Sequence, residues 1–210
     1  MSLQTQADKI LRQSRAISIA KAIWDSAGPA KAEHAYLRKK GIQPHGTKEH
    51  NGLLIVPVTD RRKIISLQYI HTNGTSRFMP NGRTRGGYYM TGKPGQSDII
   101  CIAESFAAGA SIYEMTSYPV AVAFYADNLR HVIRTIKELY PFKTLVICPD
   151  EDCLPQESTG KAKKTKAPLC SVIHAGQMTM ARQIKKLASP EAKRCQAHLL
   201  CQSLIQMLRV

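Results

Sequence analysis

Three carboxylates stand where they could act together on one ligand. Glu104 directly follows the apolar run Ile-Ile-Cys-Ile-Ala, and Asp150 and Asp152 follow the run Leu-Val-Ile-Cys-Pro. Short apolar runs of this kind, rich in β-branched residues, are typical of strands that are buried on both faces of a parallel sheet. Ligands of such sheets bind beyond the carboxyl ends of the strands. We therefore expect the three carboxylates to converge at one edge of a sheet.

The spacing of Asp150 and Asp152 indicates a metal site. Two residues apart in an extended chain, their side chains point the same way. Two carboxylates about 4 Å apart repel each other by roughly 4 kcal/mol at an effective dielectric constant near 20. A hard divalent cation with oxygen ligands, Mg²⁺ or Mn²⁺, relieves this repulsion. The alternative is that both residues cap a helix or lie in a solvated turn; the strand-end position of Glu104 favours the metal.

The elements that must position these residues alternate between strands and helices. Helical periodicity is clearest after Asp127, which is placed to cap its helix, and Pro141 ends that pattern. Small residues in the preceding helix, such as Gly109, permit close packing on a sheet. Right-handed crossovers between the strands predict a parallel sheet flanked by helices. The expected elements are a strand at 99–103, a helix at 106–115, a strand at 120–124, a helix from 127 to about 140 and a strand at 145–148.

Two segments of this region carry a resemblance to a known family. Ile-Ala-Glu-Ser-Phe-Ala-Ala-Gly-Ala-Ser, followed by Val-Ile-Cys-Pro-Asp-Glu-Asp, resembles the TOPRIM domain of primases, topoisomerases and some nucleases, most closely that of phage and plasmid primases. The resemblance covers about residues 20 to 166. It implies that Glu104 is a general acid/base beside the metal and that Asp150 and Asp152 bind Mg²⁺. One departure is Ser105, which stands where the family usually has glycine.

The part before residue 97 predicts a different organisation. Helical patterns span Thr5 to Ala27 and Lys31 to Lys40, and a period of two follows, with Asn73-Gly74 as a strong hairpin signal. The expected strands are 53–58, 63–71, 75–79 and 88–90. We thus predict an α/β protein with a TOPRIM-like parallel sheet flanked by helices, preceded by a small helical plus antiparallel β subdomain. The boundaries are 1–50 (helical), 51–96 (antiparallel β), 97–175 (TOPRIM α/β) and 176–210 (C-terminal helices, after a fourth strand near 169–173).

Basic side chains in the small β subdomain are candidates for binding nucleic acid or nucleotide. They alternate with Tyr69, Phe78, Tyr88 and Tyr89, and guanidinium groups bind phosphates while aromatic faces stack on bases. An ordinary solvated face over core aromatics is the alternative. A lysine run after residue 160 follows Gly160 but lacks the upstream glycine of a P-loop, so we interpret it as a basic segment. The candidate binding residues are Arg61, Arg62, Lys63, Arg77, Arg83, Arg85, Lys161, Lys163, Lys164 and Lys166.

The charge is unevenly distributed along the chain. The formal net charge of +15 is made up of +10 in residues 1–98, −3 in residues 99–152 and +8 in residues 153–210. An acidic centre between basic flanks is typical of a metal site beside a polyanion track. No apolar run reaches the length of a membrane span and no signal-peptide pattern is present, so we expect a cytoplasmic protein without a membrane partner. The six cysteines include no Cys-x-x-Cys pair, so we expect reduced thiols and no zinc.

These observations leave three functions open. The first is a primase-like, Mg²⁺-dependent nucleotidyl transferase acting on single-stranded DNA, as the core or remnant of a larger replication protein. The second is a metal-dependent TOPRIM nuclease. The third is a non-catalytic nucleic-acid-binding module with a degenerate site. Expected partners are single-stranded DNA or RNA and nucleoside triphosphates, with a helicase or other replication proteins as further candidates.

Overall fold

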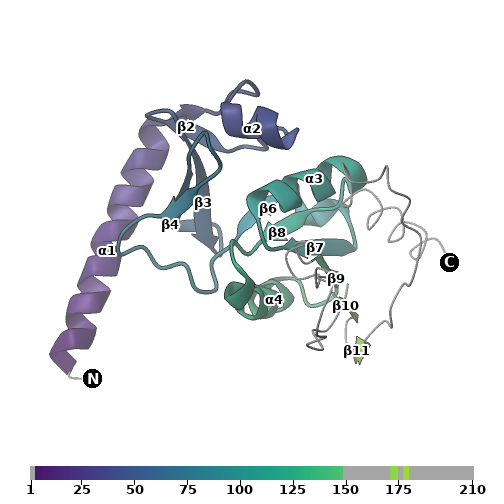
Figure 1. The fold of residues 1–210 in the computed structure, drawn as a ribbon. Helices are drawn as coiled ribbons and strands as arrows, with labels where there is room; N and C mark the ends of the chain where they lie inside the picture. The colour runs from purple at the N-terminus through teal and green to yellow at the C-terminus, as the bar shows by residue number, and fades with distance from the viewer. Residues whose placement is uncertain (1–2, 149–170, 175–176, 180–210) are drawn as a thin grey trace, which may run out of the picture.

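The computed structural model describes residues 3–148, 171–174 and 177–179, which form two β-sheets and the helices that cover them (Figure 1). The first sheet is antiparallel, with the strand order β1-β2-β3-β4-β5. Its strands are β1 (Gly28–Pro29), β2 (Lys48–His50), β3 (Leu53–Asp60), β4 (Lys63–Ile70) and β5 (Ser76–Phe78). The predicted antiparallel sheet is thus confirmed, and β1 and β2 extend it with residues from before position 51.

The turn between β4 and β5 contains the predicted Asn73-Gly74 signal. The Oδ1 atom of Asn73 accepts a hydrogen bond from the backbone N–H of Thr75 at 2.9 Å, and Gly74 has a φ of 97°. Glycine adopts this left-handed conformation without steric cost. The local sequence therefore determines this connection.

Helix α1 (Leu3–Ser26) packs against one face of the first sheet (Figure 1). Its buried residues Ala16 and Ala20 form a core cluster with Leu67 of β4 and with Met79. Within the described part of the chain, no helix combines the length and the apolar character needed to cross a membrane.

Helix α2 (Ala35–Lys40) is shorter than the sequence predicts. It begins after His34, whose Nδ1 atom accepts a hydrogen bond from the backbone N–H of Tyr36, and it ends at Gly41 in the left-handed conformation. The expected first turn, from Lys31, is not helical, because His34 caps the helix immediately before Ala35. His34 is also buried.

The second sheet is mixed, which corrects the prediction of a wholly parallel sheet. Its order is β11-β10-β9-β7-β8-β6, and β7 is parallel to both β8 and β9. The other pairings are antiparallel: β6 with β8, β10 with β9, and β11 with β10. The strands are β6 (Tyr89–Thr91), β7 (Ile99–Ala103), β8 (Val120–Val122), β9 (Thr144–Cys148), β10 (Ser171–His174) and β11 (Gln177–Thr179), and a 3-10 turn η1 (Pro94–Gln96) precedes β7.

Two of these strands differ from the predicted assignments. We expected residues 88–90 in the small β subdomain; Tyr88 does form an isolated antiparallel bridge with Thr59 of β3, but β6 lies at the edge of the second sheet, where it pairs with β8. We expected Gln177 to begin a C-terminal helical segment, but it begins β11. In both cases the partner is distant in sequence, or follows a tight reversal, and local periodicity does not reveal it.

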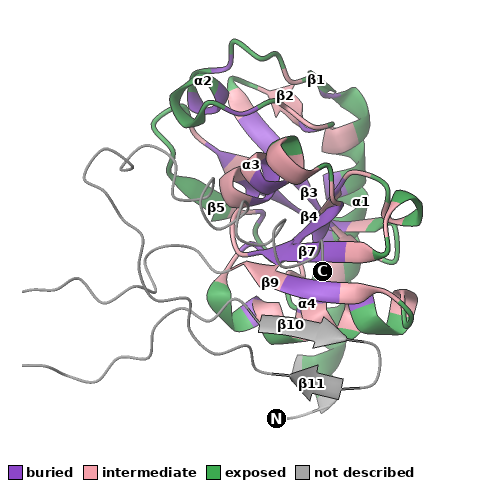
Figure 2. Cartoon of the chain, turned by 90° about the vertical axis from the view of Figure 1, so that its right-hand side faces the viewer, coloured by how far each residue is buried: buried purple, intermediate pink, exposed green. Residues whose placement is uncertain are grey.

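Helices α3 (Phe106–Thr116) and α4 (Ala126–Leu139) cover opposite faces of the second sheet. Alternation along β7 shows this directly: Ile100 and Ile102 join the α4 cluster, whereas Cys101 and Ala103 join the α3 cluster. The central strands are buried on both faces, as their continuous apolar runs predict (Figure 2). The helix periodicity and the strand runs were therefore interpreted correctly.

Close packing of α3 depends on Gly109. A Cβ atom at this position would lie 2.5 Å from Cγ2 of Val122, a distance that real side chains essentially never show. The cluster of small residues in this helix therefore allows it to approach the sheet, as predicted.

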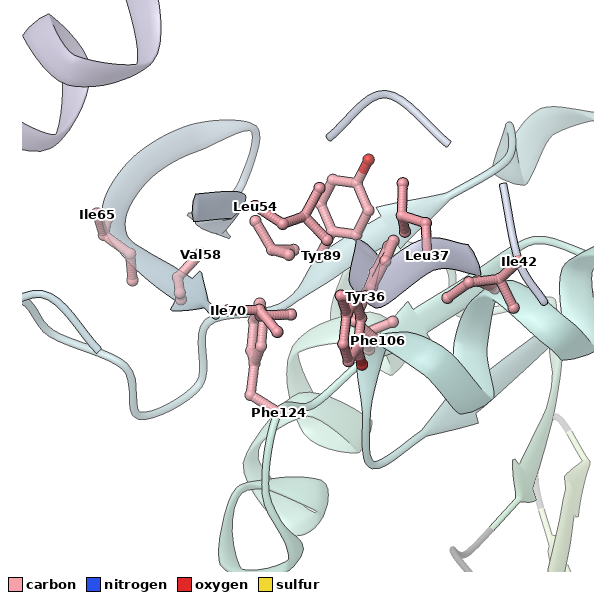
Figure 3. Packing of buried hydrophobic residues seen from close by; sticks show 13 residues of the cluster. Tyr36, Leu37, Ile42, Leu54, Val58, Ile65, Ile70, Tyr89, Phe106 and Phe124 are labelled. Carbon is pink, nitrogen blue, oxygen red and sulfur yellow. The ribbon is translucent and has the colours of Figure 1, made fainter. Parts of the chain in front are cut away.

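The two sheets share one hydrophobic core (Figure 3). Leu54, Val56 and Val58 of β3 lie in the same cluster as Phe106 of α3 and Val122 of β8. Tyr36, Leu37 and Ile42, from α2 and its carboxyl end, also contribute to this cluster. The first sheet is therefore packed firmly against the part of the molecule that carries Glu104.

Candidate active site and basic surface

Glu104 lies immediately after β7 and is half-buried. The next residue, Ser105, is the N-cap of α3, and its Oγ atom accepts a hydrogen bond from the backbone N–H of Ala108 at 3.2 Å. Ser105 has a φ of −110°, which any L-residue adopts readily, so this turn does not require the glycine that the TOPRIM family usually has. Serine is also a preferred N-cap residue. The departure from the family pattern is therefore compatible with the local fold.

The carboxyl ends of β7 and β9 lie at the same edge of the sheet. The two strands are parallel neighbours, and Ala103 at the end of β7 is opposite Cys148 at the end of β9. The chain leaves β7 at Glu104 and leaves β9 two residues before Asp150. Asp150 and Asp152 lie outside the described residues, as do Lys161, Lys163, Lys164 and Lys166. Their convergence with Glu104 thus stays a prediction.

Thiol groups lie beside this edge. Cys101 and Cys148 are free cysteines on neighbouring strands. The hydrogen bond with Cys101, and secondarily burial, raise the pKa of the Cys148 thiol well above its ordinary value. A protonated, half-buried thiol is a poor nucleophile and metal ligand. Among the described residues, no three His, Cys, Asp or Glu side chains are grouped so that they could hold a metal ion.

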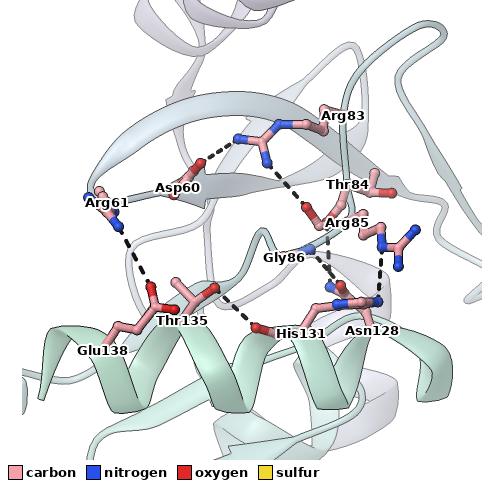
Figure 4. A network of polar contacts seen from close by, with 10 residues as sticks. All are labelled: Asp60, Arg61, Arg83, Thr84, Arg85, Gly86, Asn128, His131, Thr135 and Glu138. Atoms are coloured by element: carbon pink, nitrogen blue, oxygen red, sulfur yellow. Dashed lines mark hydrogen bonds and ion pairs between the residues drawn. The ribbon is translucent and has the colours of Figure 1, made fainter. Parts of the chain in front are cut away.

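Three of the predicted basic residues meet in one polar network between the two sheets (Figure 4). Arg61, in the turn between β3 and β4, forms an ion pair with Glu138 of α4 at 3.6 Å. Arg83 forms an ion pair with Asp60, and Nε of Arg85 donates a hydrogen bond to Nε2 of His131 at 2.9 Å. Arg61 and Arg83 are thus partly neutralised by acids, whereas Arg85 is bonded to a histidine.

The other described basic residues lie outside this network. Arg62 and Lys63 are exposed in and just after the β3–β4 turn. Arg77, on β5, is exposed and stacks over the ring of Tyr69, with 5.9 Å from Cζ to the ring centroid. The structure therefore places Arg61, Arg83 and Arg85 together, and Arg77 on a separate strand.

The proposed stacking role of the aromatics is only partly compatible with the structure. Tyr88 and Tyr89 are core residues, 4% and 8% exposed, so their rings are inaccessible to bases. Phe78 and Tyr69 are half-buried. Phe78 packs edge-on against Phe124, with ring centroids 5.8 Å apart.

Phe124 also marks the true end of the second predicted strand. We expected this strand to continue to Phe124, but β8 ends at Val122 and Phe124 has a φ of 73°. This left-handed conformation is unfavourable for a bulky residue. Burial of the ring against Phe78 in the shared core offsets part of that cost.

Asn128 holds in place the loop between β5 and β6, which carries Arg83 and Arg85 and which we call the basic loop. We did not predict this role from the sequence. This fully buried residue of α4 accepts a hydrogen bond from Gly86 N–H at 2.7 Å and donates to the carbonyl oxygens of Gly87 and Ala123 at 2.9 and 2.8 Å. Its side chain supplies hydrogen-bond partners for backbone groups that would otherwise lack them. Asp127, which we expected to cap α4, lies in its first turn, and the N-cap residue is Tyr125, which makes no side-chain cap hydrogen bond. The available signal was a polar residue on the apolar face of an otherwise regular helix.

Two glycines bring the same loop onto the first sheet. A Cβ atom at Gly87 would lie 2.5 Å from Cγ1 of Val58, and one at Gly82 would overlap Oγ of Ser66. The loop between β5 and β6 is therefore fixed at both ends. Arg83 and Arg85 project from a rigid support.

We predict that this rigid basic loop contributes to the binding of single strands. Replacing Arg83 and Arg85 together by alanine should lower the salt dependence of binding, measured as the slope of log K against log salt, by about 0.7 for each phosphate that the variant no longer neutralises. Fluorescence anisotropy of a labelled oligodeoxythymidylate measures the slope. All sequences should weaken alike, because phosphate contacts do not read bases.

A matched control is the replacement of Arg12 and Arg15, two exposed residues of α1, by alanine. This variant loses the same formal charge, so long-range electrostatics should affect both proteins equally. If the two double variants have the same slope, the loop arginines do not contact phosphate.

Comparison with known proteins gives one consistent relationship. A DNA primase TraC of Escherichia coli is 30% identical over 140 residues, which are 63% of this chain and 13% of the relative. A second DNA primase TraC of Escherichia coli is 27% identical over 131 residues, 59% of this chain and 9% of the relative. The chain thus spans about an eighth and about a tenth of the curated relatives it matches. No family model matches the chain, and no solved structure matches it. The similarity supports a primase-related family.

Proposed function

We propose that this chain carries out primase-type, Mg²⁺-dependent nucleotidyl transfer on single-stranded DNA, using a TOPRIM-like site. The observation that carries the proposal is the position of Glu104, at the edge of the sheet where β9 also ends, two residues before the Asp-x-Asp sequence. The similarity to two DNA primases supports the choice of reaction. Acting on DNA, the protein would work in the cytoplasm with a helicase or other replication proteins.

The donor set fits a hard divalent cation. Carboxylate oxygens are the ligands that Mg²⁺ prefers, and Glu104, Asp150 and Asp152 are all carboxylates that follow strands. Asp150 and Asp152 would hold the ion, with Glu104 beside it. When bound, Mg²⁺ would neutralise charge on the triphosphate and make the attacking hydroxyl more acidic.

The protein side chains have separate roles in this proposal. Glu104 would act as the general base that accepts the proton of the 3′-hydroxyl, while this hydroxyl attacks the α-phosphate of the incoming nucleotide and pyrophosphate leaves. The basic loop, with Arg83 and Arg85, holds phosphates of the template or of the incoming nucleotide. The hydrophobic core packs the first sheet against α3, the helix that follows Glu104.

The test is an extension assay with Mg²⁺, a single-stranded DNA template and labelled ribonucleoside and deoxyribonucleoside triphosphates. Template-dependent oligonucleotide products are the expected result. Cleavage of the strand without extension would replace the proposal by a metal-dependent nuclease. Retention of the strand without either reaction would indicate a non-catalytic binding module.

The metal site can be tested without activity. Because a cation relieves the repulsion between Asp150 and Asp152, Mg²⁺ or Mn²⁺ should raise the melting temperature of the wild-type protein. At a concentration of 100 times the Kd, the stabilisation is about 2.7 kcal/mol. Differential scanning fluorimetry of wild type and of the Asp150→Asn/Asp152→Asn variant measures the effect. Equal shifts of the melting temperature in the two proteins would show that these aspartates do not bind the metal.

A further inference from the structure

Four basic side chains gather where the rigid loop meets α4, and the sequence motifs do not account for three of them. Arg85 comes from the loop, and Arg130, His131 and Arg134 come from α4. The three arginines are exposed, and His131 is half-buried. Arg134 is three residues after His131 and four after Arg130, so it neighbours both of them on the helix surface, and Arg130 and Arg134 are both close enough to His131 to act on its charge.

The contact between Arg85 and His131 defines the protonation state of the histidine. Nε of Arg85 is a donor under all conditions, so Nε2 of His131 must be the acceptor at 2.9 Å. The imidazole is therefore neutral, with its proton on Nδ1. In this state Nε2 of His131 accepts the hydrogen bond that the Nε–H group of Arg85 donates.

Two of the acids around this cluster are paired with other residues. Asp60 is bound by Arg83, and Glu138 is bound by Arg61 at 3.6 Å (Figure 4). Asp127 is exposed in the first turn of α4. Partial burial of His131, followed by Arg85, Arg130 and Arg134, lowers the pKa of the imidazole, and no carboxylate is among the causes. On the elements that carry or face His131, the charged groups are Asp127, Arg130, Arg134 and Glu138 of α4, Arg83 and Arg85 of the loop, and Asp60, Arg61 and Arg62 of the β3–β4 turn, whereas Lys137 lies on another side of α4.

We propose that Arg85, Arg130, His131 and Arg134 form a binding site for a backbone phosphate of single-stranded nucleic acid, and that His131 takes up a proton from solvent when the phosphate binds. The nature of the anion rests on the proposed function, whereas the site itself rests on the geometry. Guanidinium groups form forked hydrogen bonds to phosphate oxygens, and a protonated imidazole adds a further donor. The phosphate also receives the Nε–H of Arg85, which the protonated histidine no longer accepts.

The direction of the pH dependence follows from this exchange. Without an anion, partial burial and then the three arginines oppose protonation of His131, so its pKa lies below the ordinary value of about 6.5. A bound phosphate reverses the local field and raises that pKa. Binding should therefore tighten as the pH falls through this window, by up to about tenfold per pH unit if one proton is taken up.

The first measurement follows the ring of His131 by NMR, with inorganic pyrophosphate as the probe. The spectrum of His131→Gln identifies its resonance among those of the seven histidines. We expect pyrophosphate to raise the pKa of His131 in the full chain, and expect this rise to be absent in Arg85→Ala/Arg134→Ala. An unchanged titration curve would overturn the proposal.

The second measurement is anisotropy of a labelled oligodeoxythymidylate at pH values on either side of about 6.5. Wild type should bind more tightly at the lower pH. His131→Gln should bind weakly at both pH values, and His131→Lys, with a permanent charge, should bind well at both. Lys137→Ala is the matched control, because Lys137 is an exposed cation on a different side of α4 from His131 and its replacement should retain the wild-type pH dependence.

The two measurements separate this inference from the proposed function. If pyrophosphate raises the pKa of His131 but the oligonucleotide does not bind, the anion site holds and the nucleic-acid assignment fails. If the oligonucleotide binds and His131→Gln keeps the wild-type pH dependence, the site is wrong while the proposed function survives. Melting curves of each variant verify that it is folded under the assay conditions.

Discussion

Glu104→Gln should reduce nucleotidyl transfer by at least about 100-fold and leave the melting temperature close to that of wild type. Loss of a general base typically costs a factor of about 100 to 10,000. Glutamine has the size and shape of glutamate but cannot accept a proton at neutral pH. Glu104 follows β7 without being part of the apolar core, and glutamine keeps its size and shape, so we expect only a small change in stability. The extension assay and thermal melting measure the two effects.

The matched control is Glu33→Gln, which makes the same change at an exposed position before α2. Its activity and stability should equal those of wild type. If Glu104→Gln instead unfolds the protein, or retains full activity in the folded state, the carboxylate is structural and the catalytic assignment is incorrect. Retention of DNA binding by the inactive variant would place the defect in the chemical step.

The strands of the α/β region could be predicted from sequence because their burial is uniform. Strand β7 presents Ile100 and Ile102 to α4 and Cys101 and Ala103 to α3, and such a strand must be apolar at every position. The stripe of α4, with Val132 and Ile136 fully buried, was equally clear. The position of Glu104 followed from these assignments, since the residue after a buried parallel strand lies at a ligand-binding edge.

The direction of the outer strands could not be predicted in this way. Periodicity identifies which residues are buried, and it carries no information on which neighbour a strand pairs with. Strand β6 pairs antiparallel with β8, which comes later in the chain than β7, although β6 follows directly on the first sheet. The shared core explains why: Tyr89 of β6 lies in the same cluster as Leu54 and Phe106, so this short strand joins the two sheets.

The basic surface illustrates the same limit at the level of single side chains. Arg83 and Arg85 lie in the loop between β5 and β6, and their partners Asp60 and His131 are 23 and 46 residues away. Whether an arginine is neutralised by an acid or paired with a histidine depends on these tertiary contacts. Arg130 and Arg134 were ordinary helix-surface residues in the sequence, and they gain significance only because the loop brings Arg85 beside them.

Asn128 is the residue on which the position of the basic loop depends most strongly, so its replacement should have the largest effect on stability. Asn128→Ala leaves the N–H of Gly86 and the carbonyl oxygens of Gly87 and Ala123 without the side chain that pairs them. Each buried, unpaired group costs about 1 to 3 kcal/mol. Because the loop can relax toward water, we expect the free energy of unfolding, measured with urea, to fall by about 3 kcal/mol in total.

Asn128→Asp should be more destabilising than Asn128→Ala at neutral pH and should recover as the pH falls. The aspartate oxygen that replaces Nδ2 faces the carbonyl oxygens of Gly87 and Ala123, which lie 2.9 and 2.8 Å from this position. Burial and these carbonyls raise the pKa of the carboxyl in the folded state above its unfolded value of about 3.9. The folded state then binds more protons than the unfolded state, so the free energy of unfolding rises as the pH falls through the raised pKa.

Urea unfolding at pH about 4.5 and about 8 measures the difference. The control is Asn81→Asp, which makes the same change at an exposed position in the same loop. An Asn128→Asp variant as stable as wild type at pH about 8 would show that the Nδ2 hydrogen bonds do not hold the loop.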